Sequence, residues 1–115
     1  MNLQDAIIYD LETFPNCFTC AVEGFYNDFN AVWEISHFRD DREGLFQFLQ
    51  HLSRCQIPMI GFNSIAFDYV IVHFLLENPT ATVEQIYAKS QEIFSTQGRF
   101  GKTIWADQRY IPQID

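Results

Sequence analysis

The spacing of apolar residues changes along the chain, and this change limits the possible folds more than any other feature. In the segments 17–26 and 30–38, apolar and polar residues alternate, as they do in β-strands that bury one face. From residue 40 onward, leucine and phenylalanine recur every three or four residues, which is typical of an amphipathic helix. The chain must therefore combine a sheet with helices.

Further elements complete the predicted order. Residues 5–11 are rich in β-branched and aromatic residues, and Pro15 and Asn16 favour a turn after them, so we predict that three strands form an antiparallel meander. The short apolar run 57–62 does not alternate, which favours a strand covered on both faces. We predict helices over 40–54, 65–78 and 82–94 and the start of a further strand over 110–115.

This order predicts one α/β domain. A meander followed by alternating helices and strands implies a mixed sheet flanked by helices. The 115 residues suit a single domain, and hydrophobic residues, at 48% of the chain, supply enough apolar surface for a core. The sequence has neither a secretory signal nor an apolar run long enough to span a bilayer. We therefore expect a cytoplasmic protein without a membrane partner.

Three cysteines, an odd number, argue against a disulfide framework. Cys17 and Cys20 form a C-x-x-C sequence, but residues three apart on a strand point to opposite faces of the sheet. We therefore expect this pair to be buried, unreactive thiols and not a metal site.

The chain is acidic, with 15 Asp and Glu residues against 7 Lys and Arg residues and a formal net charge of −8. A nucleic-acid-binding domain that acts alone normally presents a basic face, so this charge argues against that class. It is compatible with a site that is built from carboxylates and neutralised by cations.

Two of the carboxylates, Asp10 and Glu12, lie in the sequence "AIIYDLET", in a run that otherwise suits a buried strand. Because they are two residues apart, both side chains leave a strand on the same face. Carboxylates that lie so close repel each other, and a divalent cation such as Mg²⁺ removes the repulsion. Taken alone, however, the pair is better explained as the solvated face of an edge strand.

A second polar feature strengthens the metal interpretation. The sequence "GFNSIAFDYV" places Asn63 at the end of the predicted strand 57–62 and Asp68 in the first turn of the helix that follows. An acid there can simply complement the helix dipole, but α/β sheets also hold their ligands at such strand ends. Asp68 can face Asp10 and Glu12 at this edge, and three carboxylates would hold two metal ions.

The two motifs resemble those of the DEDD superfamily of 3′–5′ exonucleases, which includes the proofreading domains of DNA polymerases. "YDLET" is similar to the first motif, D-x-E-T, and "GFNSIAFD" is similar to the second, N-x-x-x-F-D. The order and separation of the motifs also resemble a proofreading domain, and their wording is most similar to bacteriophage polymerases. The resemblance covers nearly the whole chain, as the N-terminal part of such a domain, and implies a ribonuclease H-like fold.

The resemblance implies an enzyme that hydrolyses the phosphodiester bond at the 3′ end of single-stranded DNA with two Mg²⁺ or Mn²⁺ ions. It implies that Asp10, Glu12 and Asp68 are the catalytic metal ligands, with Asp10 as the bridge between the ions. The residues that it assigns to the DNA are Thr13, Phe14, Asn63 and Phe67. Phe14 suits stacking on a base and packing in the core equally, whereas Phe67 suits packing better.

The resemblance also implies partners that lie outside this chain. A polymerase domain, in the same polypeptide or in a separate one, would supply the basic DNA channel that this acidic chain lacks. The expected compartment is the cytoplasm, which is that of the bacterial host if a phage encodes the protein.

The chain departs from the family in one respect. The third motif of the family, Y-x-x-x-D or H-x-x-x-x-D, supplies a fourth carboxylate and a residue that orients the attacking water. Here Tyr110 is followed by Asp115 at a spacing of five, in a segment that is typical of extended chain, and this is not that motif. We therefore expect that the chain stops before the third motif and that, alone, it has weak or no nuclease activity.

Two other interpretations remain. One is a catalytically incomplete exonuclease fold that serves as a binding or scaffold protein, for example by self-association. The other is a different nuclease or a transposase of the ribonuclease H-like fold, which suits Thr13 and the N-x-x-x-F-D motif less well.

Overall fold

The computed structural model of the chain describes residues 3–62, 64–96 and 104–115. Its strands form one mixed five-stranded sheet in the order β3-β2-β1-β4-β5. The strands are β1 (Ile7–Phe14), β2 (Cys17–Gly24), β3 (Asn30–Ser36), β4 (Met59–Ile60) and β5 (Gln113–Ile114). β1, β2 and β3 pair antiparallel as a meander, whereas β4 and β5 run parallel to β1 on its other side.

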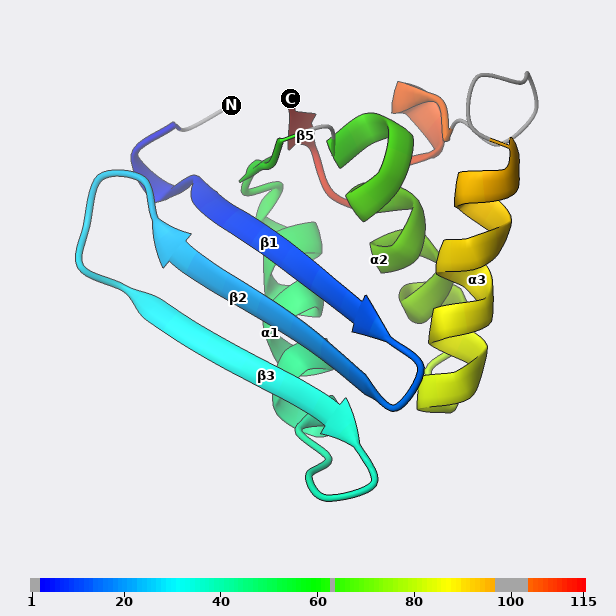
Figure 1. The fold of residues 1–115 in the computed structure, drawn as a ribbon. Helices are drawn as coiled ribbons and strands as arrows, with labels where there is room; N and C mark the ends of the chain where they lie inside the picture. The colour runs from blue at the N-terminus through cyan, green and yellow to red at the C-terminus, as the bar shows by residue number, and fades with distance from the viewer. Residues whose placement is uncertain (1–2, 63, 97–103) are drawn as a thin grey trace.

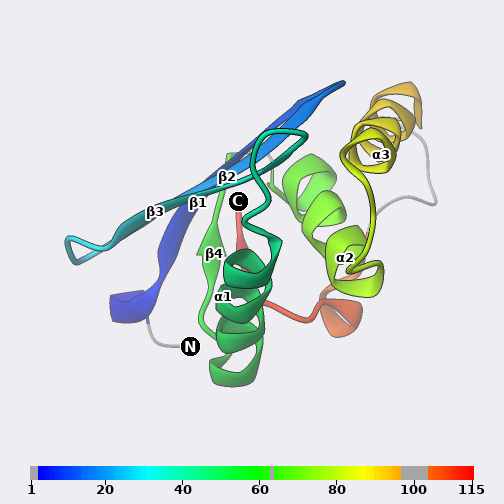
Figure 2. The same cartoon turned by 90° about the horizontal axis from the view of Figure 1, so that it is seen from below.

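The helices cover one face of the meander, and the other face is open (Figures 1 and 2). The three α-helices are α1 (Arg42–Cys55), α2 (Tyr69–Glu77) and α3 (Val83–Thr96), and α2 is preceded by a π-helical turn, Ser64–Asp68. Two short 3₁₀ turns, Leu3–Asp5 and Ala106–Gln108, complete the described elements. The molecule is thus an α/β domain in which the sheet presents one face to solvent.

Alternation along the strands decides which side chains meet the helices. On β1, Ile7, Tyr9 and Leu11 are buried beneath the helices, whereas Asp10 and Glu12 are exposed on the open face. The core also includes every second residue of β2 and the inner sides of the helices. Its members include Phe18, Val22, Leu45, Leu49, Leu52, Ile71, Leu75 and Ile86.

The predicted order of elements agrees with the structure, and the differences lie at the ends. β1 continues to Phe14 because Pro15 and Asn16 form a tight turn that leads directly into β2. The predicted strand over 57–62 forms ladder pairs only at β4, where it lies between β1 and β5. Within the described residues, no helix combines the length and the apolar composition that crossing a bilayer requires.

The C-x-x-C cysteines lie on opposite faces of β2, as predicted, and both are free thiols. Cys20 lies in the core, where burial raises the pKa of its thiol to about 12. Cys17 lies on the open face and is only partly buried, so the expectation of two buried thiols is wrong for this residue. The error arises because none of the described helices covers that side of the meander.

Candidate functional site

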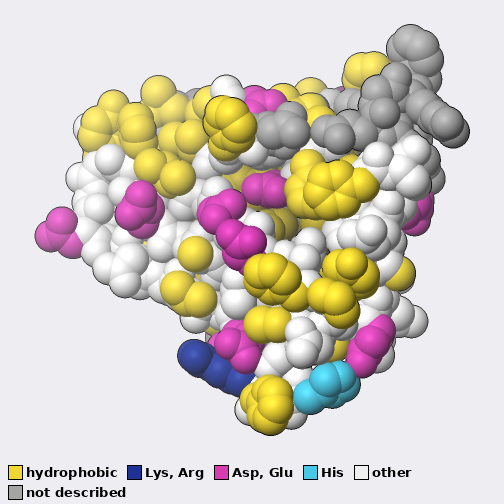
Figure 3. All heavy atoms as spheres, viewed as in Figure 1, with side chains coloured by type: hydrophobic (Ala, Val, Ile, Leu, Met, Phe, Trp, Pro, Cys, Tyr) yellow, Lys and Arg dark blue, Asp and Glu magenta, His cyan; other side chains and the backbone are white. Residues whose placement is uncertain are grey.

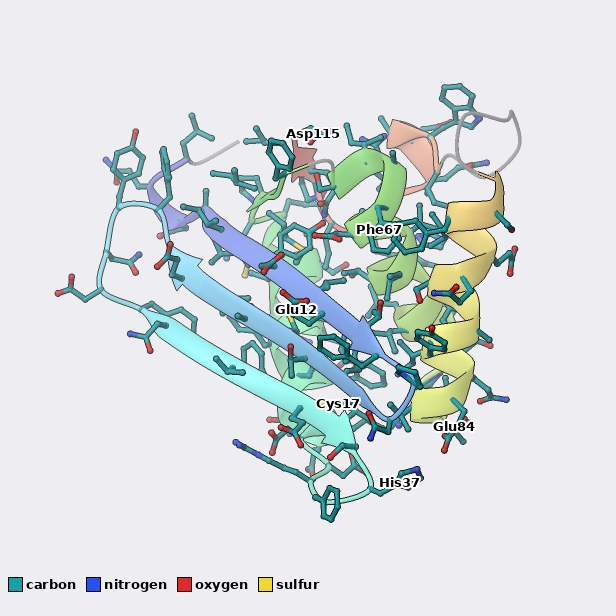
Figure 4. All side chains as sticks on the ribbon, viewed as in Figure 1. Glu12, Cys17, His37, Phe67, Glu84 and Asp115 are labelled. Carbon is teal, nitrogen blue, oxygen red and sulfur yellow. The ribbon has the colours of Figure 1, made fainter. Side chains whose placement is uncertain are left out.

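Asp10 and Glu12 project from the open face of β1. Their neighbours on β2 are Ala21 and Thr19, whose short side chains leave both carboxylates uncovered. In Figure 4, the Glu12 side chain rises from the middle of β1, and Figure 3 shows acidic side chains gathered on this face. The sequence analysis predicted that the two acids share a face, and the structure confirms it.

The parallel strands end beside these acids. Ile8 of β1 is paired with Ile60 of β4, and Ile60 is paired with Ile114 of β5. These three residues therefore lie side by side across the sheet. Beyond it, β1 continues to Asp10, β4 leads into the turn before α2, and β5 reaches its last residue. Ligand sites of α/β sheets lie at this edge, just past the carboxyl ends of parallel strands.

Asp68 approaches the edge from the π-helical turn Ser64–Asp68. Such turns are rare in proteins and occur frequently at functional sites. Asp68 is 8% exposed, and the pKa of its carboxyl is raised to about 7. Burial is the largest cause of this rise, and the negative charges of Asp10, Glu12 and Asp115 add to it. Asp68 therefore lies within electrostatic reach of the predicted acidic pair.

Asp115 is a fourth carboxylate at the same edge, which the sequence analysis set aside because it does not fit the third motif. The backbone N–H of Ser64 donates a hydrogen bond to Asp115 Oδ1 at 3.1 Å. Asp115 follows β5, and Figure 4 shows it beside β5, next to the turn that leads into α2. In the sequence, the one indication of this placement was that Asp115 directly follows Ile114, in the segment predicted to begin a further strand.

The described part of the chain offers this group no basic partner. Within residues 3–62, 64–96 and 104–115, no lysine, arginine or histidine forms an ion pair with Asp10, Glu12, Asp68 or Asp115. Four acids that face one another without a counter-charge repel, and burial of one of them increases the cost. Among the described residues, the arrangement therefore has no counter-charge.

The donor chemistry of the group fits a hard divalent cation. Mg²⁺ and Mn²⁺ prefer carboxylate oxygens, and Mg²⁺ usually keeps several waters alongside one or two carboxylates. Among the residues that the structure describes, no three Asp, Glu, His or Cys side chains lie close enough to enclose one ion by themselves. The described side chains therefore do not form a ready-made three-ligand metal site.

A packed layer supports the acids from below. Tyr9 Oη donates a hydrogen bond to Gln113 Oε1 at 2.7 Å and so ties β1 to β5 beneath the edge. Gly61 permits this closeness, because a Cβ atom there would come within 2.8 Å of Ser64 Cβ and 2.9 Å of the Tyr9 ring. Burial and the charge of Asp68 both raise the pKa of Tyr9, so this phenol is a neutral hydrogen-bond donor.

The residues predicted to contact DNA have different surroundings. Phe14 is 51% exposed at the end of β1, so its interpretation as a core residue is wrong. Phe67 is partly buried against the core, and its ring lies 4.8 Å from that of Phe94 on α3, which confirms packing as its structural role. Thr13 is partly buried on β1. Asn63 lies outside the described residues.

Comparisons of the chain with models of protein families, with curated proteins and with solved structures find no match.

Proposed function

We propose that this chain is the metal-binding part of a 3′–5′ exonuclease domain that acts on single-stranded DNA. One observation carries the proposal: the buried Asp68 carboxyl lies within electrostatic reach of Asp10, Glu12 and Asp115, and no described basic residue pairs with any of the four. A structural acid cluster normally includes its own counter-charges, whereas a site for a cation leaves the charge for the ion to neutralise.

The topology supports the family that the motifs resemble. An antiparallel meander on one side of β1 and two strands parallel to β1 on the other form a mixed sheet that is compatible with a ribonuclease H-like fold. The first motif lies on the central strand and the second on the turn into α2, so the two motifs converge although 56 residues separate Glu12 from Asp68. We therefore infer that the resemblance extends from the wording of the motifs to their placement.

The chain's own residues have distinct roles in this proposal. Asp10 and Glu12 provide open oxygen ligands, and Asp68 provides a third whose charge is costly until a cation neutralises it. A pair of bound divalent ions supplies activation of the attacking water and stabilisation of the leaving 3′ oxygen. Phe14, exposed beside the acids on the same face of β1, offers a ring on which the terminal base can stack.

The 115 residues do not contain the Y-x-x-x-D or H-x-x-x-x-D motif that orients the water in the family. Loss of such a group lowers a rate by about 10²–10⁴-fold. We therefore propose that the chain alone has slow, metal-dependent activity, and that a polymerase domain provides the basic DNA channel.

A nuclease assay tests the proposal. Single-stranded DNA labelled at its 5′ end is incubated with Mn²⁺ and either the wild-type chain or the Asp10→Asn variant. We expect slow shortening from the 3′ end with the wild type and none with the variant. Equal shortening by both proteins would contradict the proposal, and no shortening by either would favour the binding or scaffold function.

A further inference from the structure

We propose that the free part of the β3 edge is a docking site for an extended segment of another protein, in which basic and apolar residues alternate. The segment adds a strand to the sheet beside Asn30 and Val32. This inference goes beyond the nuclease function and does not depend on a bound metal ion.

β3 is an outer strand of the sheet, and the chain covers only one half of its outer edge. In the covered half, the Glu34 N–H donates to Asp41 Oδ2 at 2.9 Å, and the Glu34 carbonyl accepts the Asp41 N–H at 2.8 Å. The Ser36 N–H donates to the Arg39 carbonyl at 2.7 Å. The loop that follows β3 therefore occupies the backbone groups at this end of the edge.

The other half of the edge has unpaired backbone groups. Every second residue of a strand directs its N–H and carbonyl away from a given neighbour, so Asn30 and Val32 direct theirs outward, as Glu34 and Ser36 do. Among the described residues, none bonds to the outward groups of Asn30 and Val32. Neither proline nor lysine, which commonly protect an open edge, occurs in β3. These groups can therefore pair with the backbone of an added strand.

The open face of the sheet beside this edge is acidic. Glu34 on β3 and Glu23 on β2 lie on this face, Asp28 precedes β3, and Figure 3 shows acidic side chains spread over it. Within the described parts of the chain, no basic residue forms an ion pair with these three acids. A shallow hollow between the strands is lined in part by Ala21, Glu23 and Val32. A lysine or arginine of the added strand can lay its alkyl stem in this hollow and direct its charge to the acids.

The helix side of the same edge is apolar. The rings of Phe29 and Trp33 lie 5.6 and 4.9 Å from the ring of Phe48 on α1, and Phe29 remains 44% exposed. Successive side chains of a strand point to opposite faces, so every second side chain of the added strand faces these rings. Apolar residues therefore suit the positions between the basic ones.

A second copy of this chain fits the edge less well. The symmetric antiparallel pairing that uses the free groups of both copies places Asn30 of one copy opposite Val32 of the other. The same register brings Asp28 of each copy toward Glu34 of the other, and like charges on facing strands destabilise a sheet. Each copy also has a formal net charge of −8, which adds repulsion. A basic segment replaces this repulsion with attraction.

Amide NMR spectra of the 115-residue chain, titrated with a short synthetic peptide that alternates lysine and valine, test the proposal. A second peptide contains the same lysines and valines in two separate blocks, so it has the charge but not the alternation. We expect the alternating peptide to shift the amide signals of Asn30 and Val32 and to bind about 10-fold more tightly than the block peptide. Equal affinity for the two peptides would overturn the proposal.

Two variants at one position test the strand pairing. Val32→Pro removes an outward N–H and leaves the bonds to β2, since proline is tolerated on edge strands where the N–H faces solvent. Val32→Thr keeps the N–H. We expect Val32→Pro to bind the alternating peptide about 10-fold more weakly than Val32→Thr does. Equal affinities of the two folded variants would refute pairing at this edge.

Charge reversals test the basic character of the partner and do not alter the backbone of the edge. Glu23→Lys should weaken binding of the alternating peptide about 5-fold. Asp107→Lys changes the net charge equally at an exposed residue of the turn Ala106–Gln108 and should leave the affinity unchanged. Equal effects of the two reversals, or no binding by the wild type, would refute the basic partner. Protection of the Asn30 and Val32 amides that increases with protein concentration would instead assign the edge to a second copy.

Discussion

Two acidic regions of this molecule have opposite surroundings. At the corner between β3 and α1, Asp41 Oδ2 accepts the Glu34 N–H at 2.9 Å and pairs with Arg39 Nε at 2.7 Å. Asp40 Oδ1 accepts the Arg42 N–H at 3.1 Å in the same corner. Each of these two acids therefore has a basic residue or a backbone donor that offsets its charge, and together they fasten the start of α1.

Where β4 and β5 end beside β1, the charges of Asp10, Glu12 and Asp115 act on the buried carboxyl of Asp68. The Ser64 N–H donates to Asp115, and no other described hydrogen bond or ion pair reaches the four carboxylates. The comparison suggests how to tell the two kinds of cluster apart. Acids that stabilise the fold are surrounded by donors, whereas acids that bind a ligand are held in place and left without a counter-charge.

The largest expected effect is on the pH dependence of stability. The pKa of Asp68 is about 7 in the folded chain, against an ordinary value of 3.8, so the folded chain binds more protons than the unfolded chain between these values. The free energy of unfolding of the metal-free protein should therefore fall as the pH rises from about 4 to 7, by up to roughly 4 kcal/mol.

Urea denaturation at pH 5 and pH 8 without divalent metal measures this change. Asp68→Asn, which keeps the shape of the side chain, should remove most of it, and Mg²⁺ at pH 8 should restore the stability of the wild type. An identical pH dependence in the wild type and in Asp68→Asn would contradict the interpretation of Asp68 as a buried acid among acids.

Removal of a paired acid should have the next largest effect. Asp41→Ala loses the bonds to the Glu34 N–H and to Arg39, so we expect the free energy of unfolding to fall by about 2 kcal/mol. Binding of Mn²⁺ should be unchanged, because this corner lies apart from the proposed metal site. Urea denaturation and Mn²⁺ titration measure the two properties on the same preparation.

Removal of an unpaired acid should raise the free energy of unfolding of the metal-free protein instead of lowering it. Asp10→Asn relieves repulsion within the group, so the metal-free protein should gain roughly 1 kcal/mol of stability at pH 8. The same variant should lose the rise in unfolding temperature that Mn²⁺ gives the wild type. A loss of metal-free stability like that of Asp41→Ala would show that the two acidic regions do not differ as we describe.

The smallest effect on stability is expected for Phe14→Ala. Because Phe14 is half exposed, the free energy of unfolding should change by no more than about 0.5 kcal/mol. Binding of single-stranded DNA in the presence of Ca²⁺ should nevertheless weaken by about 1–3 kcal/mol, which fluorescence anisotropy can measure. Unchanged DNA affinity would remove Phe14 from the proposed site.

The sequence predicted the meander, the three helices and the shared face of Asp10 and Glu12, because these follow from periods of two and of three to four residues. It did not reveal that Asp115 lies within electrostatic reach of Asp68. β4 and β5 are two residues each, and pairing between parallel strands depends on the packing of the helices that connect them, which no local pattern records. Likewise, the exposure of Cys17 and Phe14 follows from which face the helices leave open.

The central claim is that the four carboxylates await a divalent cation, and calorimetric titration of the wild-type chain with Mn²⁺ at pH 8 tests it most directly. We predict saturable binding that Asp10→Asn abolishes and Asp41→Ala preserves. At a free Mn²⁺ concentration 100 times the dissociation constant, binding should add about 2.7 kcal/mol to the stability of the folded chain. A wild type that shows neither saturable heat nor a rise in unfolding temperature would contradict the claim.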